Sequence, residues 1–351
     1  MFFFASIASV AFASCTNDEN IFEGVKNGRE MTFVAADYVH QTRGEHDWGA
    51  FTNANYQVWA WVDSTDNAHI SGLEVAKNGT YIGDYAGKTY YWPDEALDFA
   101  AISPANDPRI KVARTAGGAT TVTYKFDASH GNEQINLMHA DFVDAQKKTT
   151  PTVALGFRHA LAKLNVVVQQ TQDPKPGAPE GTSDVKGYEV IVKKLSINGF
   201  HTQGQYVVSN NTQNTKDNVW TIATPGDTTN WNIITSATSL VEDITSFTSK
   251  PHTAKYGTNG YVMPQALADS VKVNFDYDIV TVFKSGATSR INKTHQVNLN
   301  SITNGSNPIK NWYTNKNITY TFTINPKHAL TAIEFNAKEE EWGPTDGSDI
   351  F

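Results

Sequence analysis

Hydrophobic and polar residues alternate along most of this chain. Every second residue from Val271 to Ile279 is apolar, and the residues between them are Lys, Asn or Asp. The segment from Ile318 to Ile324 repeats the pattern with Thr at the intervening positions. Successive side chains of a β-strand point to opposite faces, so both segments are predicted to be strands with one buried face. Similar patterns predict strands at Met31–Tyr38, Tyr56–Val62, Leu97–Ile102, Thr120–Phe126, Leu161–Gln169, Tyr188–Val192, Leu195–Phe200, Val219–Ala223 and Ala332–Ala337.

Turn-forming dipeptides separate several of the predicted strands. Asn-Gly pairs occur at positions 78–79, 198–199, 259–260 and 304–305, and this dipeptide favours the tight turns of β-hairpins. No segment of 12 or more residues keeps a clean apolar helical face, and only Asp94–Phe99 is expected to form a single helical turn. Many short strands with frequent turns are typical of β-sandwiches, so the fold class is predicted to be all-β.

The length of the chain favours two domains. Its 351 residues exceed the usual length of one domain, and a hydrophobic content of 40% is enough to fill two cores. The polar stretch 145–151 is the best candidate for a linker. We therefore expect an N-terminal β-sandwich over residues 16–150 and a C-terminal β-sandwich over residues 151–351.

The first fifteen residues have the pattern of an export signal. Residues 2–13 form an apolar run that is too short to cross a bilayer as a helix, and Ser14 and Cys15 follow it. Small residues before a cysteine resemble a lipoprotein cleavage site, at which the cysteine is acylated. We therefore expect residues 1–15 to be a signal segment ending at a lipidated Cys15, which anchors the protein in the outer membrane. The alternative is a buried N-terminal strand with an incidental cysteine.

Composition and motifs argue against several function classes. The net charge is -8 and no run of basic residues occurs, so nucleic acid is not an expected partner. The ten His residues include no H-E-x-x-H motif, and G-x-S-x-G is absent. We expect no catalytic residue, no metal site and no cofactor, and a hydrolase is the function that the residues support least.

Two tryptophans on one strand allow two interpretations. Trp59 and Trp61 share a face of the predicted strand Tyr56–Val62, and paired aromatic rings can stack on sugar rings. The opposite face of the strand is also apolar. A strand that is apolar on both faces is more simply a fully buried one, so core packing is favoured over glycan binding.

Six short motifs follow one another along the chain. They are Thr42-Arg43, Tyr91-Trp92-Pro93 with Leu97–Pro104, Gln134–Ala140, Phe157–Leu164, Tyr261–Gln265 and Glu340-Glu341-Trp342. In this order and spacing they resemble the fimbrillin family, the type V pilins of Bacteroidetes. Asn136 departs from the family's pattern, which often has Asp there. The acidic residues Asp18 and Glu19 behind Cys15 also resemble a surface-export signal of Bacteroidetes lipoproteins.

The resemblance implies a fold and an assembly mechanism. It implies two transthyretin-like β-sandwich domains in tandem and a lipoprotein precursor on the cell surface. In polymerising members, an arginine-specific protease removes the N-terminal strand, and a strand of the neighbouring subunit fills the groove. For this chain the resemblance implies cleavage between Arg43 and Gly44 and a removable strand at about residues 28–43. It also implies a donor strand at about residues 331–351, whose plugs would be Ile333, Phe335 and Trp342.

Both parts of this mechanism have simpler alternatives. Arg43 could be an ordinary loop arginine, and the C-terminal strand could pair within its own domain. Gly343, Pro344 and Gly347 would interrupt a long donor strand.

The expected function is therefore that of a structural or accessory subunit of a cell-surface adhesive pilus. Its partners would be other pilin subunits. The alternative is a non-polymerising surface lipoprotein that binds a host glycan or protein. One chain does not distinguish a stalk subunit from a tip or an anchor.

Overall fold

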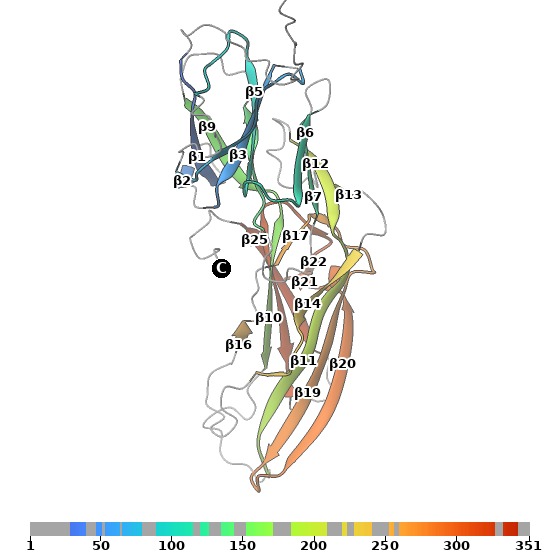
Figure 1. Cartoon of the computed structure of the whole chain (residues 1–351). Coiled ribbons are helices and arrows are strands. Elements are labelled where there is room, and N and C mark those ends of the chain that lie inside the picture. The colour runs from blue at the N-terminus through green and yellow to red at the C-terminus, as the bar shows by residue number, and fades with distance from the viewer. Residues whose placement is uncertain are drawn as a thin grey trace, which may run out of the picture.

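The computed structural model describes residues 29–39, 47–50, 53–63, 65–78, 89–114, 120–125, 135–143, 152–170, 184–208, 220–222, 228–240, 253–255, 260–326 and 333–342. The molecule is elongated, and its sheets form two lobes stacked end to end (Figure 1).

Seven strands form the sheet of the first lobe, which we call the N-lobe. Their order is β2-β1-β9-β8-β5-β3-β4. β1 runs parallel to β9, and every other neighbouring pair in this sheet is antiparallel. The strands are β1 (Thr32–Val39), β2 (Asp47–Ala50), β3 (Tyr56–Val62), β4 (Ala68–Val75), β5 (Leu97–Ser103), β8 (Met138–Val143) and β9 (Thr152–His159).

A four-stranded sheet, which we call the bridging sheet, combines two distant parts of the chain. Its order is β13-β12-β7-β6. β6 (Ile110–Arg114) and β7 (Thr120–Lys125) come from the first half of the chain, whereas β12 (Gln203–Val208) and β13 (Trp220–Ile222) come from the second. This sheet therefore ties the two halves of the chain together.

Two sheets facing each other form the C-lobe. One has the order β16-β10-β24-β25-β21-β22, with β17 also paired to β10, and the other has the order β14-β11-β19-β20, with β15 paired to β11. β18 and β23 form a separate pair. The strands are β10 (Ala162–Gln170), β11 (Val185–His201), β14 (Thr228–Ile234), β15 (Thr238–Ser239), β16 (Thr253–Lys255), β17 (Gly260–Val262), β18 (Gln265–Ala266), β19 (Lys272–Phe283), β20 (Thr288–Asn298), β21 (Thr303–Asn304), β22 (Asn307–Pro308), β23 (Asn311–Trp312), β24 (Lys316–Ile324) and β25 (Glu334–Glu341), and a 3-10 helix, η2, spans Leu299–Ser301.

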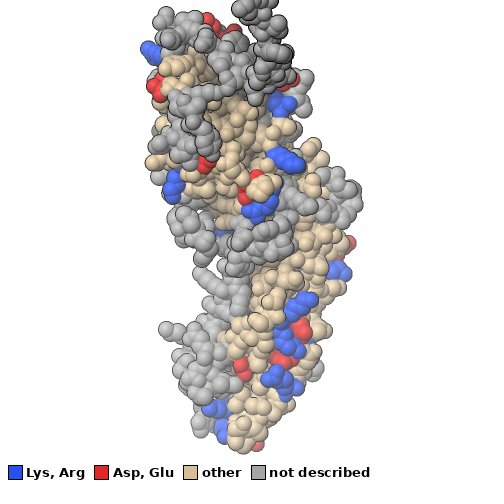
Figure 2. Space-filling model, viewed as in Figure 1, with Lys and Arg blue, Asp and Glu red and all other residues tan. Residues whose placement is uncertain are grey.

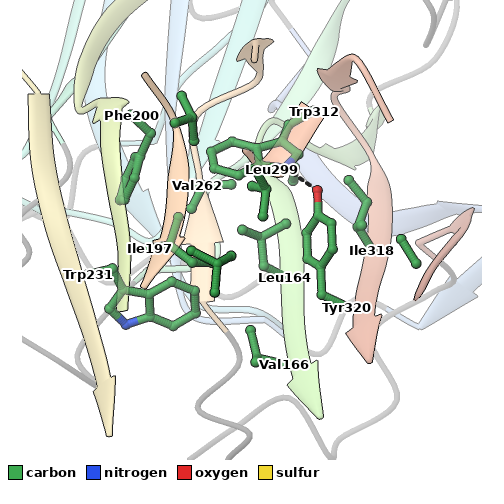
Figure 3. Packing of buried hydrophobic residues seen from close by; sticks show 14 of the residues in the cluster. Leu164, Val166, Ile197, Phe200, Trp231, Val262, Leu299, Trp312, Ile318 and Tyr320 are labelled. Carbon is green, nitrogen blue, oxygen red and sulfur yellow. Dashed lines mark hydrogen bonds between the residues drawn. The ribbon is translucent and has the colours of Figure 1, made fainter. Parts of the chain in front are cut away.

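The alternation of apolar residues fills the space between the sheets of the C-lobe. Leu164 and Val166 of β10 face Ile197 and Trp231 of the opposite sheet (Figure 3). A buried polar contact lies in the same layer, where Trp312 Nε1 donates a hydrogen bond to the Tyr320 hydroxyl at 3.0 Å (Figure 3). Buried indole and phenol groups usually need such a partner, so the contact stabilises this part of the core.

The outer face of β19 carries a network of opposite charges. Asp278 accepts hydrogen bonds from Arg290 at 2.8 Å and Asn292 at 3.0 Å, and Lys193 lies 3.1 Å away. Burial opposes ionisation of Asp278, but these polar contacts outweigh it and lower its pKa. Charges of both signs gather where Figure 1 places β11, β19 and β20 (Figure 2). The polar positions of these strands therefore form a solvated face.

The all-β prediction is confirmed, and three local expectations are wrong. Tyr188–Val192 and Leu195–Phe200 belong to one strand, β11, whose register shifts let it bend without ending. The Asn198-Gly199 pair lies inside β11, where Gly199 has a φ of 83° at an irregularity, instead of forming a turn. Asp94–Phe99 forms no helical turn, because from Leu97 onward the chain pairs with β3 and β8 on its two sides.

Other turn and linker predictions have mixed outcomes. The turn at Asn304-Gly305 is confirmed between β21 and β22, with Gly305 at a φ of 61°. The predicted linker 145–151 lies outside the described residues.

Candidate functional site

The residues predicted to act in export and cleavage lie outside the described part of the chain. These are Cys15, Arg43 and Gly44. The structure does describe most of the predicted removable strand, as β1, and the three predicted plugs of the C-terminal strand. The site is therefore built from these two strands and their surroundings.

β1 is an inner strand of the N-lobe sheet. Its residues Thr32–Asp37 pair with Thr152–Phe157 of β9, and its other edge pairs with the four residues of β2. Its inward side chains enter the N-lobe core: Met31, directly before the strand, is fully buried, and Phe33 packs edge-on against Phe99 at 6.2 Å. β1 therefore supplies both backbone pairing and core side chains.

The chain just before β1 is also held by backbone hydrogen bonds. The Trp92 amide donates to the Arg29 carbonyl at 3.0 Å, and the Met31 amide donates to the Tyr90 carbonyl at 2.8 Å. These bonds keep the backbone around Arg29 in an extended, paired conformation.

β25 lies inside the C-lobe sheet of its own chain. All eight of its residues pair with β24, and Phe335 stands opposite Phe322 with the two rings 5.4 Å apart. Ile333 is buried and Phe335 is half-buried against the C-lobe core. In this structure two of the predicted plugs, Ile333 and Phe335, pack into the core of their own chain's C-lobe.

The inward faces of β1 and β25 carry side chains of similar size at the same spacing. Met31, Phe33 and Ala35 form this face at the start of β1, and Ile333, Phe335 and Ala337 form it in β25. The residues between them, Thr32 and Val34 in one segment and Glu334 and Asn336 in the other, are exposed. The two segments thus share one pattern of inward large aliphatic, phenylalanine and alanine side chains.

Trp342 follows β25 and occupies an aromatic seat. Its ring lies parallel to the His159 ring, with centroids 3.6 Å apart and planes 2° apart, and nearly parallel to the Tyr261 ring at 5.3 Å. Lys163 Nζ lies 5.7 Å from the centre of the indole, within the range of a cation–π interaction. We call His159, Lys163 and Tyr261 the Trp342 seat.

Backbone hydrogen bonds place this seat where the N-lobe meets the C-lobe. β9 ends at His159 and β10 begins at Ala162, so only Ala160 and Leu161 separate the two sheets. The Trp342 amide donates to the Asn315 carbonyl at 3.0 Å, and the Asn315 amide donates to the Leu161 carbonyl at 3.1 Å.

Trp342 is 6% exposed, and its Nε1 has no hydrogen-bond partner among the residues that the structure describes. A buried N–H without a partner typically costs about 1–3 kcal/mol, so the indole is held by ring stacking and the Lys163 cation–π contact without a hydrogen bond from its own N–H.

A buried polar layer lies beside the seat. His139 of β8 stands opposite Arg158 of β9, and its ring lies 5.2 Å from that of Tyr206 on the bridging sheet. Burial, together with the nearby Arg158 guanidinium, lowers the pKa of His139 to about 4. The imidazole is therefore neutral near pH 7. Trp220 Nε1 donates to the Ala160 carbonyl at 2.8 Å and fastens the bridging sheet to the same point.

The two tryptophans of β3 do not form an open platform. Trp61 is 5% exposed, and the Arg114 guanidinium lies 4.8 Å from its ring centre. Arg114 also forms a buried ion pair with Asp98. Trp59 is half-buried against the C-lobe core, which continues under the bridging sheet. The prediction of core packing is confirmed for Trp61.

The described residues contain no group of three or more His, Cys, Asp or Glu residues that could hold a metal ion. They also contain no helix with the length and hydropathy needed to cross a membrane.

Sequence reasoning missed the Trp342 seat and the polar layer. It expected Trp342 to be a plug of the donor strand, but the indole stacks on His159, from which 183 positions separate it. Both residues lie in motifs quoted for the family resemblance, so the motif set was the only available signal.

Comparison with known proteins gives a consistent assignment. A family model described as "Fimbrillin-like" matches residues 42–342. A curated candidate fimbrium subunit, Fim1C of Bacteroides uniformis, is 28% identical over 110 residues, which are 31% of this chain and 34% of Fim1C. The chain thus matches about a third of that relative's length.

Solved structures resemble this fold at low sequence identity. A fimbrial protein from Bacteroides vulgatus has a TM-score of 0.59 and 18% identity, covering 90% of this chain and 99% of that chain. A candidate cell adhesion protein from Parabacteroides distasonis has a TM-score of 0.50 and 12% identity, covering 91% of this chain and 98% of that chain. At these identities the likeness concerns the fold.

The polar layer predicts a loss of stability in mild acid. Because folding lowers the pKa of His139 from 6.5 to about 4, the unfolded state binds the proton more tightly, and stability falls as the pH drops through this window. The contribution of this one group is on the order of 3 kcal/mol. Urea unfolding at pH 7.5 and pH 4 measures it. The variant His139→Phe, which keeps a ring beside Tyr206, should lose correspondingly less stability, and equal losses in both proteins would contradict the assignment.

Proposed function

The chain belongs to the fimbrillin-like family of cell-surface fimbrial and adhesion proteins, and from this premise we propose that it is a subunit of an adhesive fibre that joins its neighbours by exchanging strands. The family is a structural adhesion family and not an enzyme family. The proposed partners are other subunits of the fibre, either copies of this chain or related pilins.

The observation that carries this proposal is the matching inward face of β1 and β25. An incoming strand with Ile333, Phe335 and Ala337 would offer the N-lobe core the same sequence of side-chain sizes as Met31, Phe33 and Ala35. The exposed residues between them would again point to solvent. The match holds when both segments run in the same direction, so the donor would lie parallel to β9, as β1 does.

The energetics of strand loss support the same proposal. Loss of β1 would leave the facing edge of β9 and all of β2 without these backbone partners, and it would empty the positions of Met31 and Phe33 in the core. Unpaired strand edges bind other strands readily. A donor strand would satisfy the backbone groups and refill the core together.

The same reasoning suggests how the precursor is arranged. We place protease cleavage between Arg43 and Gly44, a few residues beyond β1, so that β1 leaves with the removed segment.

We also propose two transthyretin-like β-sandwiches in tandem. The division expected at residue 150 stays a prediction, and the pairing of β9 with β1 and β8 favours a boundary at Ala160-Leu161.

Anchoring of the precursor rests on Cys15. Acylation of this cysteine would hold the protein at the surface of the outer membrane, since two or more acyl chains give stable membrane binding. The non-polymerising alternative, a surface lipoprotein that binds a glycan or a host protein, stays an outcome of the tests below. The burial of Trp61 gives no support to its aromatic platform.

Cleavage at Arg43 predicts a single cut followed by assembly. Incubation of the protein that begins after Cys15 with an arginine-specific protease should give Gly44 as the new N-terminus and a ladder of oligomers on an unheated gel. Arg43→Ala should abolish both the cut and the ladder. Arg29→Ala is the matched control and should behave as the unchanged protein, because the paired backbone around Arg29 resists protease binding. An intact protein, or a cut without oligomers, would contradict strand exchange.

The matching faces predict which donor residues matter. A peptide of residues 331–342 should bind the cleaved protein, as measured by fluorescence anisotropy. Replacing Phe335 by Ala in the peptide should weaken binding at least roughly tenfold, because a buried aromatic plug is lost. The control Asn336→Ala alters an outward side chain and should change the affinity little. Equal effects of the two substitutions would refute the proposed orientation of the donor.

Lipidation predicts a specific labelling result. Cells fed an alkyne-bearing fatty acid should incorporate it into the protein, and Cys15→Ser should lose the label because the acylated thiol is gone. Ser14→Ala keeps a small residue before the cysteine and should retain the label. Labelling of Cys15→Ser at the unchanged level would exclude Cys15 as the anchor.

A further inference from the structure

The removable strand and the C-terminal strand meet the same element, β9. β1 pairs with the first six residues of β9, and the Trp342 seat includes the last residue, His159. The first part of β9 therefore lines the groove that loss of β1 would open. Its last residue, His159, contacts Trp342, which follows β25.

β1 provides most of the pairing that holds β9 in its sheet. Six residue pairs join β9 to β1, whereas three pairs, at Met138–Ala140, join it to β8. The residues from Thr152 to Gly156 have β1 as their only strand partner among the described residues. Loss of β1 would therefore leave β9 with strand pairing only at its last three residues among the described pairs, and with its core side chains.

His159 is positioned from the N-lobe side. It stands opposite Met138 of β8, and its Nδ1 lies 2.8 Å from Oδ1 of Asn136, two residues before β8 begins. Its ring stacks on Trp342 at 3.6 Å. A small shift of β9 would therefore disturb this stack directly.

Trp342 in turn closes the end of β25. The backbone hydrogen bond from Trp342 to Asn315 follows the last β24–β25 pair, Lys316 with Glu341. The buried Trp342 Nε1 has no partner among the described residues, so ring stacking, the Lys163 cation–π contact and this backbone bond hold the residue that ends the strand. Weaker stacking would let β25 fray from this end.

We propose that β9, His159 and Trp342 couple the two strands, so that loss of β1 loosens β25 in the same subunit. The inference rests on the proposed function, for which it supplies a control: a subunit would release its own donor strand only after its N-terminal strand has been removed. Uncleaved precursors would keep β25 seated and would not offer a donor strand. The coupled element has two states, with β25 closed against the seat or frayed from it.

Hydrogen exchange in the full chain tests the coupling without requiring assembly. Phe33→Ala weakens the packing of β1, and Leu73→Ala removes a buried side chain of the same N-lobe core from β4, at the far edge of the sheet. Phe33→Ala should speed exchange of the β25 amides roughly tenfold, whereas Leu73→Ala should leave them within about twofold. The amides of β10 serve as an internal reference.

A second set of variants tests whether the coupling passes through His159 and Trp342. In His159→Ala the β25 amides should already exchange faster, and adding Phe33→Ala should change them less than about twofold, because the connection is cut. Trp342→Leu should have the same effect as His159→Ala and replaces it if that variant does not fold. Trp342→Phe, which keeps a ring in the seat, should give a smaller increase.

Three results would overturn the inference. They are unchanged β25 exchange in Phe33→Ala, an equal increase in Leu73→Ala, and an equal effect of Phe33→Ala with and without His159. The oligomer ladder of the protease experiment is read separately. Faster β25 exchange in Phe33→Ala without an oligomer ladder would refute the proposed function and support the coupling. A ladder with unchanged β25 exchange would support the proposed function and refute the coupling.

Discussion

Ala160 and Leu161 carry the chain from the N-lobe sheet to the C-lobe sheet, and hydrogen bonds from three distant segments of the chain meet at them. The Ala160 amide donates to Leu137 of the N-lobe, and the Ala160 carbonyl accepts from Trp220 of the bridging sheet. The Leu161 carbonyl accepts from Asn315, whose own carbonyl holds Trp342. Three backbone groups thus fasten the N-lobe, the bridging sheet and the segment that holds Trp342 at one point. Buried backbone groups need partners, so the position of each part is constrained by the others.

β1 and β25 pack into their cores with the same series of inward side chains. β1 and β25 belong to different sheets, but each presents a large aliphatic residue, a phenylalanine and an alanine to a core. Backbone hydrogen bonding does not depend on sequence, so the inward side chains decide which strand fits which position. Under the proposed function, two strands with the same inward pattern would occupy one groove in turn, and the stability of the subunit would then be connected to its assembly.

Much of the local structure was predictable. The prediction of β3 agreed with its observed bounds, and those of β5, β7, β10 and β13 came within one residue at each end, because alternating side chains report the period of a strand. The burial of Trp61 was also predictable, since both faces of its strand are apolar. The failures came where tertiary contacts override local signals. Asn198-Gly199 favours a turn, but β11 continues through it because β14 and β19 pair on both sides.

The sequence by itself determined that the chain is a set of strands, which face of each strand is apolar, and to which family the chain belongs. The strands and their apolar faces follow from the spacing of neighbouring residues, and the family follows from the motifs that resemble it and from the match over residues 42–342. Only the tertiary structure decided which strands are neighbours, that β9 joins the N-lobe sheet, and that His159 meets Trp342. Any two strands can form the same ladder, so the choice of partner depends on the packing of distant residues, which no local pattern encodes.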